Sequence, residues 1–281
     1  MEEKAVLITG CSSGIGLCLA QGLQRRGYRV FASARKAEDV DRLNAQGLES
    51  LRLDLSDSES IKHGLNEVLG RSGGRLYALI NNGAYGQPGA VEDLSREVLR
   101  RQFETNLFGT QELTNAVLPV MRRQGYGRII QISSILGFVC LAYRGAYNAT
   151  KYALEALTDT LRLELRDTAI HLALVEPGPI RTRFRENTYA AYKANIDPAA
   201  SAHRECYKAL ERRLAGQAGP MPFTLPPEAV LPKVVHALEA RRPRVRYPVT
   251  FPTYLFAALK RLWPHRWLDR LLARVSDCGD R

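Results

Sequence analysis

A tyrosine and a lysine, Tyr147 and Lys151, stand four residues apart in a stretch whose pattern predicts a helix, 147–166. That spacing places both side chains on one face of the helix, about one turn apart. A nearby ammonium group favours the phenolate, so we expect the pKa of the tyrosine to fall below its usual value near ~10. A tyrosine tuned in this way can donate a proton to a carbonyl oxygen or accept one from an alcohol. Taken alone, the same spacing is typical of an ordinary surface pair.

Glycines cluster directly after the first apolar run of the chain. The segment reads Thr9-Gly10-Cys11-Ser12-Ser13-Gly14-Ile15-Gly16. Glycines let the backbone turn sharply and approach a pyrophosphate, while the start of the following helix supplies amide donors and a favourable dipole. The spacing GxxxGxG differs from the general dinucleotide pattern GxGxxG. A tight structural turn is the alternative, and the strand–turn–helix context favours the dinucleotide site.

Basic residues follow the second predicted strand, where the choice between the two nicotinamide cofactors is made. An acidic side chain at this place holds the ribose hydroxyls of NAD, whereas an arginine accommodates the 2′-phosphate of NADP. This chain has Arg35 and Lys36 there, with no carboxylate before Glu38. The pattern therefore favours NADP(H) over NAD(H). The alternative is that the two cations only solvate the start of a helix.

Short apolar runs alternate with longer amphipathic stretches over the first two-thirds of the chain. We predict strands at 5–9, 28–32, 48–53, 76–80, 128–132, 170–175 and 245–249, where Pro248 suits only an edge strand or a strand end. We predict helices at 15–26, 37–46, 58–70, 95–123 and 147–166. The alternation indicates an α/β fold built from βαβ units. The expected architecture is one Rossmann-type domain over residues 1–250, a doubly wound parallel sheet of about seven strands with helices on both faces.

Residues 180–226 lack this regularity. They carry scattered aromatic side chains and end in a Gly-Pro-Met-Pro sequence. Ligands of open parallel sheets bind beyond the carboxyl ends of the strands, and an insertion after the sixth strand falls at that edge. We therefore expect 180–226 to form a substrate lid. The alternative is a surface excursion without a role in binding.

The last segment, 251–281, is both basic and aromatic. It contains both tryptophans, and three arginines, Arg266, Arg270 and Arg274, recur every four residues beside an apolar helical face. We interpret it as a basic amphipathic helical extension. Such a segment can lie on an anionic membrane surface, or it can pack over the substrate pocket or on a partner subunit. Both interpretations suit a lipophilic substrate.

The overall composition argues against several classes of protein. The 40 Lys and Arg residues outnumber the 29 Asp and Glu residues, but much of the excess lies after residue 240, which is unlike a uniformly basic nucleic-acid binder. The five cysteines form no CxxC pair, so we expect neither a metal site nor a disulfide framework. The chain has no signal-like start and no apolar run of ~18 residues. We expect a cytoplasmic protein, with 251–281 as the segment that could contact a membrane peripherally.

Seven motifs in a fixed order resemble those of the short-chain dehydrogenase/reductases of the classical type. They are Thr9-x-x-x-x-Gly14-x-Gly16, Asp54-Leu55, Asn81-Asn82-Gly83, Asn106, Ser134, Tyr147-x-x-x-Lys151 and Pro177-Gly178-x-x-x-Thr182. The C-terminal layout is similar, more weakly, to retinol dehydrogenase-like, 17-beta-hydroxysteroid dehydrogenase-like and aldehyde-reductase members. The resemblance implies an oxidoreductase that transfers hydride between NADP(H) and a carbonyl or alcohol. It also implies a homodimer or homotetramer.

The resemblance assigns four catalytic residues. Tyr147 would donate the proton to the carbonyl oxygen, and Ser134 would hydrogen-bond the same oxygen. Lys151 would lower the pKa of Tyr147 and hold the nicotinamide ribose. Asn106 would anchor a water molecule of a proton relay. Without the resemblance, Asn106 would be interpreted as a residue on a helix surface.

The resemblance also implies a set of cofactor-binding positions. Asp54 would contact the adenine, Asn81 and its neighbours would line the cofactor, and Pro177, Gly178 and Thr182 would hold the nicotinamide carboxamide. The full set is Gly10, Ser12, Ser13, Gly14, Ile15, Gly16, Arg35, Asp54, Leu55, Asn81, Gly83, Tyr147, Lys151, Pro177, Gly178, Ile180 and Thr182. Without the resemblance, Asp54 would be interpreted as a turn former and Thr182 as a helix cap.

One motif departs from the family pattern Asn-Asn-Ala-Gly. This chain has Asn81-Asn82-Gly83-Ala84, with Gly86 two residues later. Because Ala adopts a positive φ less easily than Gly, we expect the loop beside the nicotinamide to run differently here.

Three functions compete on these observations. The first is an NADP(H)-dependent oxidoreductase that reduces a lipophilic aldehyde or ketone, or oxidises the alcohol in reverse. The second is a catalytically silent NADP(H)-binding regulator, which the complete Asn-Ser-Tyr-Lys set disfavours. The third is a peripheral membrane protein that acts through its C-terminal tail. An epimerase or dehydratase on the extended version of this fold is disfavoured by the chain length and by Arg35.

Overall fold

A seven-stranded sheet forms the centre of the computed structural model, which describes residues 4–216 and 222–276. Its strand order is β3-β2-β1-β4-β5-β6-β7, and every neighbouring pair is parallel. The strands are β1 (Ala5–Ile8), β2 (Arg29–Ala34), β3 (Glu49–Arg52), β4 (Ala78–Asn81), β5 (Gly127–Ile132), β6 (Ile170–Glu176) and β7 (Arg246–Pro248). The order reverses between β1 and β4, which is where sheets of this kind bind ligands. The predicted fold class is confirmed.

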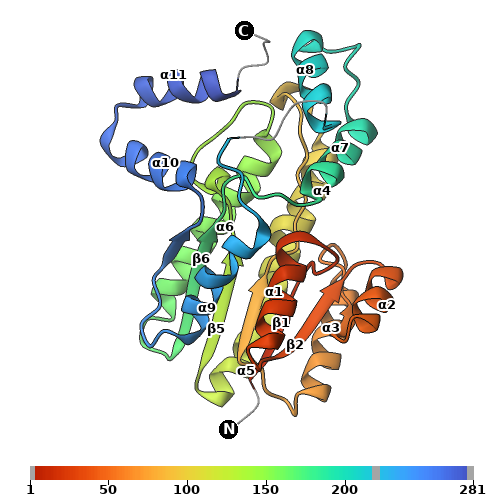
Figure 1. Ribbon diagram of the computed structural model, residues 1–281, viewed down its shortest axis with the longest axis vertical. Helices are drawn as coiled ribbons and strands as arrows, with labels where there is room; N and C mark the ends of the chain where they lie inside the picture. Colours follow the sequence, from red (N-terminus) through yellow and green to blue (C-terminus); the bar gives the residue numbers. More distant parts are fainter. Residues whose placement is uncertain (1–3, 217–221, 277–281) are drawn as a thin grey trace.

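Helices cover both faces of the sheet, as Figure 1 shows. One face packs against α1 (Gly14–Arg25), α2 (Ala37–Ala45) and α9 (Leu231–Glu239), and the other against α3 (Ser58–Arg71), α5 (Gly109–Gln124) and α6 (Gly145–Glu164). In β1, Val6 and Ile8 belong to the first core, whereas Ala5 and Leu7 belong to the second. Successive strand side chains point to opposite faces, so this continuous apolar run is what a central strand requires.

The predicted helix 95–123 is divided into three parts. It consists of α4 (Arg96–Phe103), a π-helical segment (Glu104–Phe108) and α5. At the junction with α5, Gly109 lies so close to the loop after β3 that a Cβ would stand 1.6 Å from the carbonyl oxygen of Leu55. The helix can therefore pack against this loop only because residue 109 is a glycine, which has no side chain.

Replacing Gly109 by Ala is expected to lower the free energy of unfolding by about 3 kcal/mol, because backbone and helix must move apart. In α3, Gly70 is exposed and has open space around its Cα. The matched variant Gly70→Ala is expected to stabilise the protein by about 1 kcal/mol through helix propensity. Urea unfolding of both variants measures the two effects, and equal stabilities would contradict the packing argument.

Residues 180–226, for which no helix was predicted, are helical over much of their length. Two helices, α7 (Phe184–Asn195) and α8 (Arg204–Leu214), lie within it. Tyr207, Leu210 and Leu214 have helical spacing and are buried with Tyr192 in a small separate core. That core also includes Leu94, Val98 and Ala146, so the two helices pack on α4 and on the start of α6. Residues 217–221 lie outside the described part of the chain.

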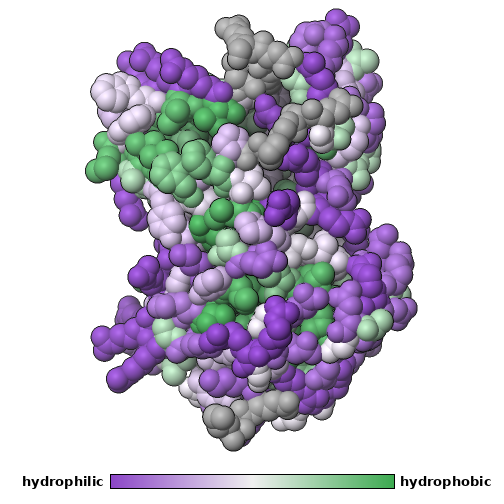
Figure 2. Space-filling view, viewed as in Figure 1, coloured by the Kyte–Doolittle hydropathy of each residue, from purple (hydrophilic) through white to green (hydrophobic). Residues whose placement is uncertain are grey.

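The C-terminal segment forms two further helices, α10 (Phe251–Leu262) and α11 (His265–Ser276). Phe256 and Leu268 are buried against Val139, in the segment that follows β5. Apolar side chains also remain exposed on this pair, and Figure 2 shows hydrophobic residues gathered over α10 and below α11, whose outer side is hydrophilic. The exposed members are Phe251, Tyr254, Leu255, Leu262, Trp263, Trp267 and Val275. Within the described residues, no helix combines the length and apolarity needed to cross a membrane.

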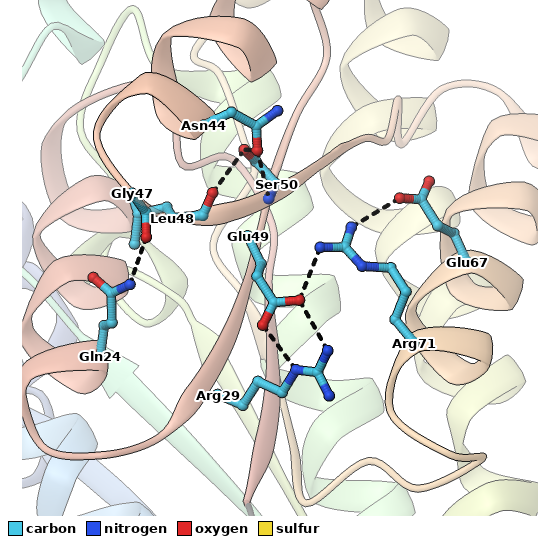
Figure 3. A network of polar contacts seen from close by, with 9 residues as sticks. All are labelled: Gln24, Arg29, Asn44, Gly47, Leu48, Glu49, Ser50, Glu67 and Arg71. Atoms are coloured by element: carbon cyan, nitrogen blue, oxygen red, sulfur yellow. Dashed lines mark hydrogen bonds and ion pairs between the residues drawn. The ribbon is translucent and has the colours of Figure 1, made fainter.

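Ion pairs hold the edge of the sheet opposite to the carboxyl ends of the strands. Glu49 at the start of β3 accepts from Arg29 of β2 at 2.7 Å and from Arg71 of α3 at 2.8 Å, and Arg71 also pairs with Glu67 at 3.0 Å (Figure 3). These contacts lower the pKa of Glu49, mainly through the hydrogen bond from Arg29. The network fixes β2, β3 and α3 relative to one another, away from the candidate site.

Candidate active site

The residues expected to do chemistry lie at the carboxyl edge of the sheet. Ser134 follows β5 and caps a short 3-10 turn, where its Oγ accepts a hydrogen bond from Leu136 N at 3.1 Å. Tyr147 and Lys151 lie one turn apart in α6, with the Lys151 Nζ 5.7 Å from the centroid of the tyrosine ring. Ser134 is close enough to Tyr147 for a hydrogen bond that affects the tyrosine's pKa. The structure thus brings these three predicted residues together.

Lys151 is buried and anchored to the sheet. Its side chain is 3% exposed, and Nζ donates to the carbonyl oxygen of Ile132 at 2.8 Å. Burial disfavours the charged form and lowers the pKa of Lys151 to about 8, whereas Glu155, one turn further along α6, acts in the opposite direction. The ammonium is therefore held at the end of β5, two residues before Ser134.

The pKa of Tyr147 moves in the direction opposite to the expectation. Burial raises it to about 12, while the hydrogen bond with Ser134 and the charge of Arg144 lower it by less. The free-energy cost of removing a phenolate from water exceeds the stabilisation that Ser134 and Arg144 provide. Lys151 is not among the main causes of the shift. Near neutral pH the Tyr147 hydroxyl is therefore protonated, which is the form that can donate a proton.

Asn106 lies in the π-helical segment between α4 and α5, and its side chain is fully engaged. Oδ1 accepts from Tyr85 N at 3.1 Å, and Nδ2 donates to Tyr85 O at 2.9 Å and to Thr150 Oγ1 at 3.3 Å. The side chain thus ties the loop after β4 to the helix that carries Tyr147. A water-binding role would fall to the backbone of Asn106. Such π-helical segments are frequent at functional sites because they rearrange the backbone hydrogen bonds of a helix.

The glycine-rich loop has the shape that a dinucleotide needs. Gly10 and Gly14 have positive φ angles of 69° and 60°. A Cβ on Gly14 would stand 2.9 Å from the Thr182 side chain, and one on Gly16 would stand 2.3 Å from the Gly10 oxygen. The first turn of α1 carries no acidic residue, and the capping residue Ser13 makes no side-chain capping bond. The free amide donors at the start of α1 fit a phosphate group.

The other predicted loop residues lie around this turn. Ser12, Ser13 and Ile15 are half-buried along it, and the Ser12 carbonyl accepts from Arg42 Nη2 at 2.8 Å. The contact of Gly14 with Thr182 brings the loop after β6 against the glycine turn. These positions therefore surround one cradle.

A set of hydrogen bonds that sequence reasoning missed connects the glycine turn to the loop after β4. Asn82 Nδ2 donates to the carbonyl oxygens of Thr9 at 2.9 Å and Gly10 at 3.0 Å. Thr9 Oγ1 accepts from the backbone N–H groups of Asn82 at 3.0 Å and Gly83 at 2.9 Å. A Cβ on Gly83 would stand 2.9 Å from Leu55 Cδ1, so the lack of a side chain at Gly83 allows close packing against Leu55. Its φ is not positive, which explains how the Gly83-Ala84 order is accommodated.

The side chains of Asn81 and Asp54 both have hydrogen-bond partners within the protein. Asn81 Nδ2 donates to Thr114 Oγ1 of α5 at 2.9 Å, so this side chain points between sheet and helix. Asp54 Oδ1 accepts from the N–H of Ser56 at 2.9 Å and from its hydroxyl at 2.7 Å. Both side chains therefore have structural partners, and Asp54 is also the turn former that the residues alone indicated.

Two arginines, not one, lie at the ends of β2 and β3. Arg35 follows β2 and is exposed, and it forms no ion pair within the described residues. Arg52 ends β3, is exposed, and donates from Nε to the carbonyl oxygen of Arg35 at 3.3 Å. Lys36, by contrast, lies 3.6 Å from the Glu38 carboxylate. Sequence reasoning missed Arg52, although its place at the end of a neighbouring strand was a usable signal.

The loop after β6 reaches both halves of the site. The carbonyl of Pro177 accepts from Ile135 N at 2.8 Å, directly after Ser134. A Cβ on Gly178 would stand 2.1 Å from Thr250 Oγ1, and Ile180 forms an isolated bridge with Leu225. The helix-cap interpretation of Thr182 fits its contact, since Oγ1 accepts from the N–H of Phe184 at the start of α7 at 3.2 Å.

The helix α7 begins against Tyr147. The ring of Phe184 meets that of Tyr147 edge-on, with centroids 5.4 Å apart. Gly86 makes room for this contact, because a Cβ there would stand 2.9 Å from Phe184 Cζ. Residues of the 180–226 range therefore border the reacting group that the sequence analysis proposed.

A partly buried charge cluster lies behind the site. Arg246 of β7 pairs with Glu155 of α6 at 3.0 Å, Asp159 at 2.6 Å and Glu176 of β6 at 3.1 Å. Burial and the nearby Glu155 raise the pKa of Glu176 from 4.5 to about 7, against the effect of Arg246. The cluster ties the strand end before Pro177 to the helix that carries Lys151.

Between about pH 4.5 and 7, folded Glu176 holds a proton that the unfolded chain releases, so stability is expected to fall as the pH rises through this window. The expected loss is about 3.5 kcal/mol in the free energy of unfolding, since the pKa rises from 4.5 to about 7 and each pKa unit corresponds to about 1.4 kcal/mol. Glu176→Gln is expected to flatten the profile, whereas Glu164→Gln, at an exposed position, is expected to leave it unchanged. Urea unfolding at several pH values measures this, and identical profiles for all three proteins would contradict it.

Comparisons with known proteins agree with this geometry. Residues 4–193 match the family "short chain dehydrogenase". The uncharacterized oxidoreductase YbbO of Escherichia coli K12 is 42% identical over 272 residues, covering 96% of this chain and 94% of its own length. Retinol dehydrogenase 8 of Bos taurus is 33% identical, covering 98% and 89%.

Solved structures give the same result. A short-chain dehydrogenase of Streptomyces avermitilis superposes with a TM-score of 0.77 at 29% identity and covers 98% of each chain. Structures of this fold have been solved with NADPH, with NADP+ and with NAD bound. The chain is an oxidoreductase of the short-chain dehydrogenase family.

Proposed function

We propose that this protein is an NADP(H)-dependent reductase of lipophilic aldehydes or ketones, and that it oxidises the corresponding alcohols in reverse. The observation that carries the proposal is a continuous set of contacts at the carboxyl edge. Gly14 meets Thr182, Thr182 caps the helix that begins at Phe184, and the Phe184 ring meets Tyr147. Only two side chains, those of Thr182 and Phe184, therefore separate the glycine turn from Tyr147. This short separation suits a cofactor whose phosphates bind at the turn and whose nicotinamide ring reaches toward Tyr147.

The proposed roles follow from the state of each group. When bound, NADPH supplies the hydride, and the protein has to orient the carbonyl and protonate its oxygen. Tyr147 holds its proton at Oη near neutral pH, because burial raises its pKa to about 12. Ser134 orients the same oxygen by hydrogen bonding, and Lys151 brings a positive charge to the end of β5. A protonated tyrosine favours the direction of carbonyl reduction.

Arg35 and Arg52 support the preference for NADP(H). A 2′-phosphate between two guanidinium groups forms charge-assisted hydrogen bonds, whereas the hydroxyl of NAD gains much less from them. Arg35 has no competing carboxylate within ion-pair distance among residues 4–216 and 222–276. The proposal therefore ranks NADPH above NADH.

The lipophilic character of the substrate rests on the surroundings of Tyr147. Phe184 borders the tyrosine, and α10 and α11 pack on residues 135–139 after Ser134. We propose that 180–226 acts as a substrate lid and that 251–281 is an extension beside the pocket. We also propose a cytoplasmic homodimer or homotetramer, which light scattering can test.

The exposed apolar surface of α10 and α11 supports a second role, peripheral contact with an anionic membrane. Trp267 and Leu262 are 57% and 78% exposed, close in the chain to Arg261, Arg266 and Arg270. Apolar side chains flanked by arginines favour such surfaces. Flotation with anionic and neutral vesicles, with and without residues 251–281, tests this role separately from turnover.

The test of the enzymatic proposal follows oxidation of NADPH and NADH with a medium-chain aldehyde, retinal and a ketosteroid. We expect turnover with NADPH and little with NADH. Tight NADPH binding without reduction of any carbonyl would favour the catalytically silent regulator instead. Faster turnover with NADH would contradict the role given to Arg35.

A further inference from the structure

Three arginines without an ion-pair partner among the described residues lie on the elements packed around the start of α6, the helix that carries Tyr147. Arg144 caps the start of α6, three residues before Tyr147, while Arg185 follows Phe184 in α7 and Arg213 lies in α8. All three are half-buried, and none forms an ion pair within residues 4–216 and 222–276. Burial lowers the pKa of Arg144 to about 10, and the charges of Arg213 and Arg185 act in the same direction.

The packing of the helices fixes this arrangement. The Phe184 ring lies 5.4 Å from that of Tyr147, which places the start of α7 over the catalytic helix. The Tyr143 ring lies 6.1 Å from that of Tyr207, which places α8 against the start of the same helix. Arg144 is thus enclosed between the two elements that supply the other arginines.

The carboxylates of the neighbouring helices have other partners. Glu186 pairs with Arg183 at 2.9 Å, and Glu211 pairs with Lys193 at 2.8 Å. Asp93 accepts a hydrogen bond from Ser201 at 2.6 Å. Holding three half-buried guanidinium groups near one another is unfavourable unless an anion joins them.

We propose that Arg144, Arg185 and Arg213 bind an anionic group of the substrate, so that the preferred substrate is an amphiphilic carbonyl compound carrying a carboxylate or a similar oxyanion. The inference rests on the proposed reductase function and narrows its substrate class. Arginine is suited to this task because its planar fork binds oxyanions through two parallel hydrogen bonds. The apolar contacts of Phe184 leave the remainder of the molecule lipophilic.

The decisive comparison uses a medium-chain ω-oxo carboxylate and its methyl ester, which differ in the charge and in one methyl group. We expect kcat/KM to be higher for the acid by on the order of tenfold or more, as charge-assisted hydrogen bonds imply. Arg213→Gln and Arg185→Gln are expected to reduce this ratio, mainly through KM. Arg204→Gln removes a charge from the exposed start of α8 and is expected to preserve it. Equal kcat/KM values for acid and ester, or ratios unchanged in both variants, would overturn the proposal.

Carboxylates of the chain itself are the alternative to an anionic group of the substrate. Ala142 N donates to Ser276 Oγ at 3.1 Å, and Asp277 and Asp280 follow in the sequence. A chain ending at Ser276 is therefore assayed in parallel, and an acid preference that arises only in this shorter chain would assign the arginines to the C-terminus instead.

Binding of the unreactive dicarboxylate sebacate separates this inference from the proposed function. Calorimetry is expected to detect binding to the wild type that weakens in Arg213→Gln. If neither carbonyl compound is reduced but sebacate binds in this arginine-dependent way, the reductase proposal fails while the anion site stands. Absence of sebacate binding to both the full chain and the shorter chain would overturn the anion site.

Discussion

Replacing Tyr147 by Phe is expected to lower kcat for carbonyl reduction by about 10²- to 10⁴-fold, the usual contribution of general acid catalysis. The variant loses only the hydroxyl group, so its ring still packs edge-on against Phe184. NADPH binding is therefore expected to persist. Steady-state NADPH oxidation measures the first effect, and a fluorescence titration with NADPH measures the second.

A second tyrosine of the same helix provides the control. Tyr152 lies five residues further along α6, partly exposed, with Lys260 over its ring. Tyr152→Phe is expected to retain activity within a few-fold. If Tyr147→Phe also stayed within tenfold of the wild type, another group would have to be the proton donor.

The raised pKa of Tyr147 also predicts how each direction of the reaction depends on pH. Reduction uses the protonated tyrosine and is expected to proceed at neutral pH, whereas oxidation of the alcohol needs the phenolate and is expected to rise with pH toward about 12. Measurements of kcat/KM in both directions over a shared pH range test this. A decline of alcohol oxidation with rising pH would contradict it.

Replacing Arg35 by Gln is expected to lower kcat/KM for NADPH by about 10- to 100-fold, since a hydrogen bond to a charged group contributes about 1.5–3 kcal/mol. The value for NADH is expected to change little, because its ribose has no phosphate at this position. The double variant Arg35→Gln/Arg52→Gln is expected to lose more of the preference. Steady-state kinetics with both cofactors gives the ratio directly.

Lys36→Gln is the matched control for the cofactor test. This lysine is adjacent in sequence but has Glu38 at 3.6 Å as its own partner. We expect it to leave the ratio of NADPH to NADH nearly unchanged. A larger effect from Lys36 than from Arg35 and Arg52 together would show that the phosphate lies elsewhere.

The sheet could be predicted because the positions of its strands follow from short, local sequence patterns. Runs such as Ala5–Ile8 are apolar throughout, and glycines mark the turns between strands and helices, so strand positions followed from the sequence to within a few residues. The pairing of Tyr147 with Lys151 was equally accessible, since helical spacing alone determines it.

What could not be predicted depends on contacts between distant segments. The direction of the pKa shift of Tyr147 follows from how completely α6 is covered, which no spacing records. The helices α7 and α8 were missed because their apolar residues face a small core shared with α4 rather than the sheet. Arg52 and Arg144 gain their significance only from neighbours on other strands and helices.

The hydrogen bonds of Asn82 with Thr9 and Gly10 have a consequence for the energetics of cofactor exchange. They order the glycine turn during folding, so the loss of backbone entropy at this turn occurs once per folding event rather than once per catalytic cycle. On the proposed function, the dinucleotide phosphates then bind and leave without a rearrangement of that loop. Asn82→Ala would transfer the entropy loss to the binding step, and its cost would recur with every turnover.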